Sequence, residues 1–160
     1  MRPQLGRPRT LTLAAAACVM LLAVLAGACA SGAPTDEPGA SPEEAFATYR
    51  ALLDARALSA SAQVLTPGSR ELLERGSSRG QQASEAAALA TAEHAAEFVV
   101  SGDRAVVRFP GVDELSPYFL SRGTSGWQID LRSMAEYIAF DAMNHWRFRS
   151  TSHPYMFAFR

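Results

Sequence analysis

The fold of this chain is decided by one stretch near its middle, His94-Ala95-Ala96-Glu97-Phe98-Val99-Val100-Ser101-Gly102-Asp103-Arg104-Ala105-Val106-Val107-Arg108-Phe109. Its two halves are rich in Val and Phe, which favour the pleated, half-buried surface of a β-strand. Between them, Ser101-Gly102-Asp103 is typical of a tight turn. The stretch therefore predicts a β-hairpin with one strand that starts near His94 and a return strand over residues 104–109, which Pro110-Gly111 ends.

A second hairpin follows the first. Residues 115–121 and 127–131 are apolar runs of strand length, and the Gly-containing loop 122–126 joins them. Alternation along the second run predicts an apolar face and a polar face. The two faces are Trp127, Ile129 and Leu131 on one side, and Gln128 and Asp130 on the other. Two consecutive hairpins predict an antiparallel sheet.

Helical signals precede the sheet. Ser41 is suited to cap a helix and Pro42 to occupy its first position. An apolar stripe at three- and four-residue spacing follows, formed by Phe46, Tyr49, Leu52, Leu53 and Ala57. Shorter helices are expected over residues 60–65, 69–75 and 84–90, with a polar loop over residues 76–82.

After the sheet, Ser133 and Glu136 have the spacing of a capping box, which predicts a closing helix that runs to about Asn144. Together these elements predict an α+β fold, in which N-terminal helices pack on a curved, cone-like antiparallel sheet and a C-terminal helix and an aromatic tail follow. Residues 41–160 are enough for a single core and too few for two.

The N-terminal segment has the features of an export signal. Three arginines and no acidic residue accompany an apolar run over residues 11–25. The run closes in Leu25-Ala26-Gly27-Ala28-Cys29, which resembles the lipobox of bacterial lipoproteins, where small residues precede a cysteine that receives a diacylglycerol thioether and an acyl chain. The resemblance implies lipid attachment at Cys29. A secretory signal cleaved near Ala28 and an uncleaved membrane anchor are the alternatives.

This resemblance divides the chain into a signal peptide (residues 1–28), a lipidated cysteine with a flexible tether (residues 29–40) and a single α+β domain (residues 41–160). It implies a protein of the bacterial cell envelope, lipid-anchored in the periplasm-facing leaflet of the outer membrane, because Ala30 stands where retained lipoproteins carry an aspartate. Without the signal, 12 arginines stand against 16 acidic residues, a net charge of −4, which disfavours nucleic acid as a partner.

The order of elements also resembles the nuclear transport factor two superfamily, whose members are called SnoaL-like. This resemblance covers residues 41–131 and rests on the capped first helix, the Gly102-Asp103 hairpin and the ending Gly126-Trp127-Gln128-Ile129-Asp130. It implies a cone-shaped α+β fold that isomerases, dehydratases and non-catalytic binding domains share, so the fold alone does not choose among them.

The polar residues considered for catalysis are His94, Glu97, Asp130 and His145. Isomerase chemistry needs a carboxylate base beside a desolvated donor, and His94 faces the cone if its segment is a strand. A satisfied structural histidine is the simpler interpretation. Three scattered histidines lack metal-ligand spacing, and no phosphate-binding loop or nucleophile elbow occurs. The sequence therefore predicts no catalytic residue, no metal and no cofactor.

Aromatic residues are crowded near the C-terminus and interleaved with arginines: Tyr137, Phe140, Trp146, Phe148, Tyr155, Phe157 and Phe159. One interpretation is that they pack over the open sheet and complete the core, with Tyr155, Phe157 and Phe159 alternating as in a strand. Such a tail would fill the pocket that enzymes keep open. The other interpretation is an exposed Arg and aromatic surface that contacts a protein partner.

The sequence as a whole predicts a membrane-anchored lipoprotein whose domain is a non-catalytic binding or assembly module. Its ligand would be a protein or a small apolar molecule. The alternative is a SnoaL-like enzyme, an isomerase or a dehydratase, that uses His94 and a nearby carboxylate.

We expect Cys29 to carry the lipid, so that the native protein partitions with membranes. The substitution Cys29→Ala removes the sulfur that forms the thioether, and it should either block processing or release soluble protein. Intact-mass measurement of the purified native protein checks this expectation, and an unacylated N-terminus would contradict it.

Overall fold

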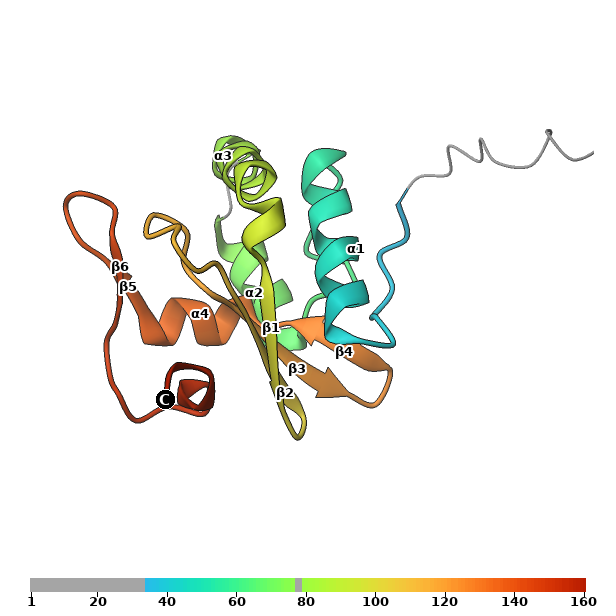
Figure 1. Cartoon of the computed structure of the whole chain (residues 1–160). Helices are drawn as coiled ribbons and strands as arrows, with labels where there is room; N and C mark the ends of the chain where they lie inside the picture. Colours follow the sequence, from blue (N-terminus) through green and yellow to red (C-terminus); the bar gives the residue numbers. More distant parts are fainter. Residues whose placement is uncertain (1–33, 77–78) are drawn as a thin grey trace, which may run out of the picture. The chain divides into compact units, whose positions relative to one another are not determined.

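The computed structural model describes residues 34–76 and 79–160, so the expected signal peptide, Cys29 and the first part of the tether lie outside the described residues. The folded unit extends from Pro34 to Arg160 (Figure 1). Its elements are α1 (Pro42–Asp54), α2 (Pro67–Gly76), α3 (Arg79–Thr91), η1 (Glu93–Ala95), β1 (Glu97–Ser101), β2 (Arg104–Arg108), β3 (Tyr118–Gly123), β4 (Gly126–Ile129), α4 (Leu131–Tyr137), β5 (Ile138–Phe140), β6 (Trp146–Phe148) and η2 (Met156–Phe159). No helix within the described ranges is both long and apolar enough to cross a membrane.

The main sheet is antiparallel with the strand order β1-β2-β3-β4, and β5 and β6 form a separate two-stranded hairpin. Ser101 pairs with Arg104 and Gly123 pairs with Gly126, so both outer turns have two residues. Gly102 adopts a φ of 61°, in the left-handed region that glycine enters at little steric cost. The α+β class and the two antiparallel hairpins are confirmed.

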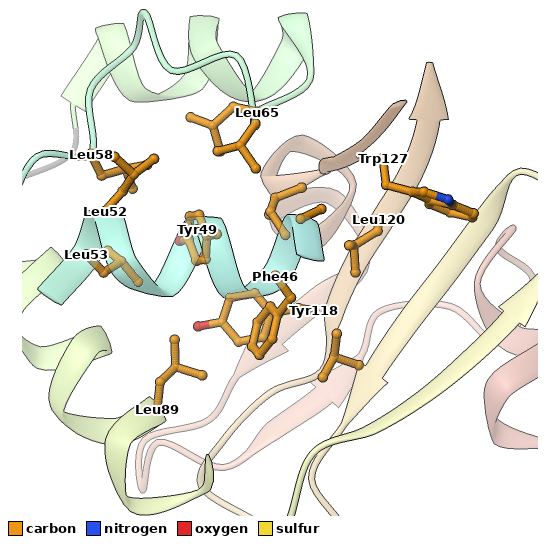
Figure 2. Close-up of a cluster of buried hydrophobic side chains, with 14 of the residues drawn as sticks. Phe46, Tyr49, Leu52, Leu53, Leu58, Leu65, Leu89, Tyr118, Leu120 and Trp127 are labelled. Atoms are coloured by element: carbon orange, nitrogen blue, oxygen red, sulfur yellow. The ribbon is translucent and has the colours of Figure 1, made fainter. Parts of the chain in front are cut away.

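The first core cluster joins α1 to one face of the sheet. The Ser41 hydroxyl accepts a hydrogen bond from the Glu44 amide at 3.2 Å, which caps α1 as expected. Side chains of α1 then pack, fully buried, on β2, β3 and β4 (Figure 2). They include Phe46, Tyr49, Leu52 and Leu53, which share one buried cluster with Val107, Leu120, Trp127 and Ile129 of the sheet. Full burial of one such side chain stabilises the fold by about 1.5–3 kcal/mol.

The second core cluster lies on the opposite face of the sheet and is built by the C-terminal segment. Val106 and Phe119 are paired in the sheet and point to this face, where they pack with Ile138, Tyr155 and Ala158. The rings of Phe119 and Tyr155 stack with centroids 4.2 Å apart and an interplanar angle of 3°. The C-terminal aromatic residues therefore complete the core, and they do so on the sheet face opposite α1.

The last residues of the expected tether belong to the folded unit. Gly39 and Trp127 exchange two backbone hydrogen bonds, at 3.0 and 2.8 Å, and Val64 donates to the Asp36 carbonyl. A Cβ atom on Gly39 would lie 2.2 Å from the Ala45 backbone nitrogen, so only glycine fits this close approach. The folded chain thus begins several residues before Ser41.

Some helix predictions are wrong. Residues 60–65 form turns rather than a helix, since Leu65 is held by a bridge to Ile129. The helix expected over 69–75 exists but begins earlier, at Pro67, which occupies a first-turn position rather than ending a helix. The loop expected over 76–82 is shorter, because α3 begins at Arg79 and contains the expected helix 84–90.

The expected strand start near His94 is also wrong, because residues 93–95 form the 3-10 turn η1 and pairing begins at Glu97. The closing helix is short: Asp130, and not Ser133, caps α4, and the helix ends at Tyr137. Residues 138–148 form the β5–β6 hairpin, so the helix does not reach Asn144. The tail ends in the 3-10 turn η2, not in a strand.

Removing residues 149–160 should strip one face of the sheet and expose Val106 and Phe119, which are both 0% exposed. We expect this truncation to abolish cooperative folding. The milder substitution Tyr155→Ala should cost about 3–5 kcal/mol, as for other large aromatic truncations in a core. Denaturant unfolding measures both, with the exposed Arg160→Ala as the control. Equal midpoints for Tyr155→Ala and Arg160→Ala would contradict the core role of the tail.

Candidate functional site

Two of the four residues considered for catalysis lie at the start of the sheet. His94 sits in η1, and its side chain is exposed. The expectation that His94 faces a cone is therefore wrong, because the segment is a turn and not a strand. Glu97 begins β1 and accepts a hydrogen bond at 2.6 Å from Arg108 across the hairpin, with both side chains substantially exposed to solvent.

The other two residues stabilise local structure. Asp130 caps α4: one carboxylate oxygen accepts from the Ser133 amide at 3.1 Å, and the other accepts from the hydroxyls of Ser133 at 2.7 Å and Tyr155 at 2.9 Å. His145 ends the β5–β6 loop, where its Nδ1 lies 3.7 Å from an Asp141 carboxylate oxygen. Among the residues that the structure describes, no hydrogen bond or ion pair joins any two of the four.

A groove of about 1030 Å³ lies between α2, α3, the loop before β3, and the segment from α4 to the β5–β6 hairpin. Its size is that of a site for a small molecule. The walls are largely aliphatic and aromatic. They include Leu72, Leu73, Leu115, Leu131, Met134 and Phe140. The groove is therefore a candidate site for an apolar ligand.

One of the carboxylates that line this groove, Glu85, is held by two buried tyrosines. The hydroxyls of Tyr49 and Tyr118 each donate a hydrogen bond of 2.6 Å to the same Glu85 oxygen, Oε1. Tyr49 comes from α1, Glu85 from α3 and Tyr118 from β3, so two helices and one strand meet here. The two phenol rings lie side by side in Figure 2, with centroids 5.8 Å apart.

The electrostatics of this cluster keep both tyrosines protonated. Burial raises the pKa of Tyr49 and of Tyr118 well above the ordinary value, and the negative charge of Glu85 raises it further. Both phenols therefore remain hydrogen-bond donors across the physiological pH range. Because each phenol donates to Glu85, both buried hydroxyls have a hydrogen-bond partner.

Sequence reasoning missed Glu85 and its tyrosines. The sequence pattern places Tyr49 in the apolar stripe of the first helix and Tyr118 in a strand. A usable signal existed, since Glu85 is an isolated acidic residue in an Ala-rich helix and a buried phenol needs a polar partner. However, Glu85 lies 36 residues from Tyr49 and 33 residues from Tyr118, and no local sequence pattern specifies these hydrogen bonds.

A second, smaller groove of about 490 Å³ lies between the loop after β2 and the C-terminal segment. Glu97 and Arg108 line it together with Trp146 and Phe159. The Arg108 guanidinium has two acceptors within the protein: it donates to Glu97 at 2.6 Å and to the Ala158 carbonyl at 2.7 Å. These bonds fasten the tail to the sheet, so we assign this groove a structural role.

His153 also has a structural role. Its ring stacks on Tyr137 with centroids 4.9 Å apart and an interplanar angle of 9°, and its Nδ1 accepts a hydrogen bond from the Tyr155 amide. Burial lowers the pKa of His153, which favours the neutral ring. A neutral imidazole packed among aromatic rings contributes to the second core cluster.

Within the described ranges, no group of three or more His, Cys, Asp or Glu side chains is arranged to hold a metal ion. Comparisons of this chain with protein-family models, with curated proteins and with solved structures each find no match. The candidate site is therefore defined by its own geometry, the groove and the Tyr49–Glu85–Tyr118 cluster.

The substitution Glu85→Ala should leave two buried hydroxyls without an acceptor, at a cost of about 1–3 kcal/mol for each. Glu85→Gln keeps an acceptor oxygen and should cost less. Urea unfolding compares the free energies of unfolding of the two Glu85 variants. The exposed Glu74→Ala on α2 is the matched control, for which we expect a change within about 0.5 kcal/mol. An equal midpoint for Glu85→Ala and Glu74→Ala would show that the cluster does not stabilise the fold.

Proposed function

We propose that this protein is a membrane-anchored lipoprotein of the bacterial envelope, and that its folded unit is a non-catalytic module which binds a small apolar ligand in the groove between α2, α3 and α4. The anchor rests on the lipobox-like ending at Cys29 and on the charged and apolar segment before it. The observation that carries the binding function is the groove itself, about 1030 Å³ with largely apolar walls.

The groove has the composition of a binding site. A ligand that covers apolar walls removes apolar surface from water, which favours binding. A few fixed polar groups orient the ligand. Phe140 lies at the groove and is 52% exposed, although a large aromatic side chain gains most when it is covered. A bound apolar ligand would cover this ring.

Binding fits the polar residues of the groove better than catalysis does. A general base needs an available proton acceptor, whereas Glu85 already accepts two hydrogen bonds from donors that keep their protons. The enzyme alternative relied on His94, which is exposed in η1. No described contact joins His94 to Glu85. We therefore favour the non-catalytic function.

A protein partner that contacts the C-terminal Arg and aromatic segment remains part of the proposal. Most aromatic residues of that segment pack in the second core cluster. The side chains left for such a partner are at the β5–β6 hairpin, where Phe140 and Met143 are 52% and 73% exposed. A partner would therefore meet this hairpin rather than the tail.

Filling the groove should weaken binding of an uncharged apolar probe such as N-phenylnaphthylamine. Ala88 lies in the groove, whereas Ala87, its neighbour on α3, is exposed outside it. We expect Ala88→Trp to weaken binding at least tenfold and Ala87→Trp to bind as the unmodified protein does. Probe fluorescence titration measures both affinities. Absence of saturable binding to the unmodified protein, or equal affinity of the two variants, would overturn the proposed site.

A further inference from the structure

We infer that two copies of this chain associate through the free edge of the main sheet, with strand β1 of one copy antiparallel to β1 of the other. The pairing joins the two four-stranded sheets into one continuous sheet about a two-fold axis at Val99. The inference is independent of the proposed ligand, because no residue of β1 lines the groove between α2, α3 and α4.

The two edges of the main sheet differ in how they are covered. At the β4 edge, the Trp127 backbone exchanges two hydrogen bonds with Gly39, and the Ile129 backbone bonds to residues 64–66. At the β1 edge, no described residue outside the β1–β2 hairpin makes a hydrogen bond with the backbone of residues 97–101 (Figure 1). An unpaired strand edge is a template for pairing with a further strand. β1 is therefore the edge at which the sheet can be extended.

The register of the hairpin shows which backbone groups of β1 face outward. Ser101 flanks a two-residue turn, so it exchanges both possible hydrogen bonds with its partner Arg104. Val99 is the next residue of β1 to do so, because hydrogen-bonded pairs alternate along an antiparallel ladder. The intervening residues, Phe98 and Val100, direct their N–H and C=O groups away from β2. These two residues offer the hydrogen-bonding groups for a second strand.

The side chains of β1 leave one large apolar group uncovered. Val100 is 51% exposed, since its neighbour across the hairpin is the small residue Ala105. Phe98 points to the same face of the sheet as Val100 and packs against the first core cluster. Residues 98–101 include no charged side chain and no proline, the residues with which sheet edges are commonly protected against pairing. Both the backbone and the side chains of this edge are thus suited to a partner strand.

A second copy of the chain fits this edge because the edge is self-complementary. When two β1 strands run antiparallel with Val99 opposite Val99, Phe98 of each copy lies opposite Val100 of the other. Both outward-facing residues then form hydrogen-bonded pairs. Each exposed Val100 is covered by a phenyl ring, an aromatic and β-branched pair of the kind that stabilises sheets. Glu97 lies opposite the neutral Ser101, so no like charges meet across the pairing.

Multi-angle light scattering of the purified native protein at increasing concentration measures the self-association. We expect a concentration-dependent dimer that Val100→Lys weakens at least tenfold, because the lysine removes the apolar contact and places a charge at the edge. Met143→Lys is the matched control. It places the same charge on an apolar residue that is 73% exposed and lies outside β1, and it should leave the dimer unchanged.

Disulfide trapping tests the register. Val99→Cys places two thiols at the two-fold axis, where the Cα atoms of opposed residues in a non-hydrogen-bonded pair are about 4.5 Å apart, within reach of a disulfide. Val100→Cys is the control, because the two copies of residue 100 are diagonal neighbours with Cα atoms about 7–8 Å apart. Cys18 and Cys29 are common to both variants and give the same background. We expect oxidation to cross-link Val99→Cys and to leave Val100→Cys at that background.

Three outcomes would overturn the inference: a protein that stays monomeric at every concentration, a dimer that Met143→Lys weakens and Val100→Lys does not, and equal cross-linking of the two cysteine variants. If Val100→Lys does not fold, the comparison of Val99→Cys with Val100→Cys decides alone, since cysteine is close to valine in size.

Discussion

The structure depends on one constraint, the burial of strand β2 on both of its faces. Ala105, Val106 and Val107 are consecutive residues and are all 0% exposed. Since neighbouring side chains of a strand point to opposite faces, each face of this small sheet needs its own cover. The helices supply one cover, through the cluster that contains Val107, and the C-terminal segment supplies the other, through the cluster that contains Val106. Without either layer, apolar surface of β2 would meet water.

The first layer also creates the candidate site. α1 buries its apolar stripe on the sheet, and this places Tyr49 beside Tyr118 of β3 (Figure 2). Two buried phenols need an acceptor, which α3 provides as Glu85. The same hydrogen bonds fix a carboxylate in the wall of a groove. A requirement of core packing, the satisfaction of buried hydroxyls, thereby builds a fixed negative charge next to apolar walls.

The candidate site was much less predictable from the sequence than the fold class. The sequence offers His94, Glu97, Asp130 and His145 as the carboxylates and donors that isomerase chemistry needs. Their contacts are local: Asp130 caps α4, and Glu97 pairs with its cross-strand neighbour Arg108. No local pattern identifies Glu85, because its partners lie on α1 and β3, which are distant in the sequence. Buried polar clusters of this kind are specified by packing and not by a motif.

The sequence by itself determined the elements whose signals are local. Ser41 and Pro42 set the start of α1, and Gly102 sets the two-residue turn of the first hairpin, because capping and positive φ depend on single residues. Tertiary structure alone decided the segments with competing propensities. Residues 138–148 form a hairpin and the tail a 3-10 turn, because the face with Val106 and Phe119 had to be covered. Residues 93–95 form a 3-10 turn before β1, and the Gly39 backbone exchanges hydrogen bonds with that of Trp127. In both places, packing between residues distant in the sequence outweighs local preference.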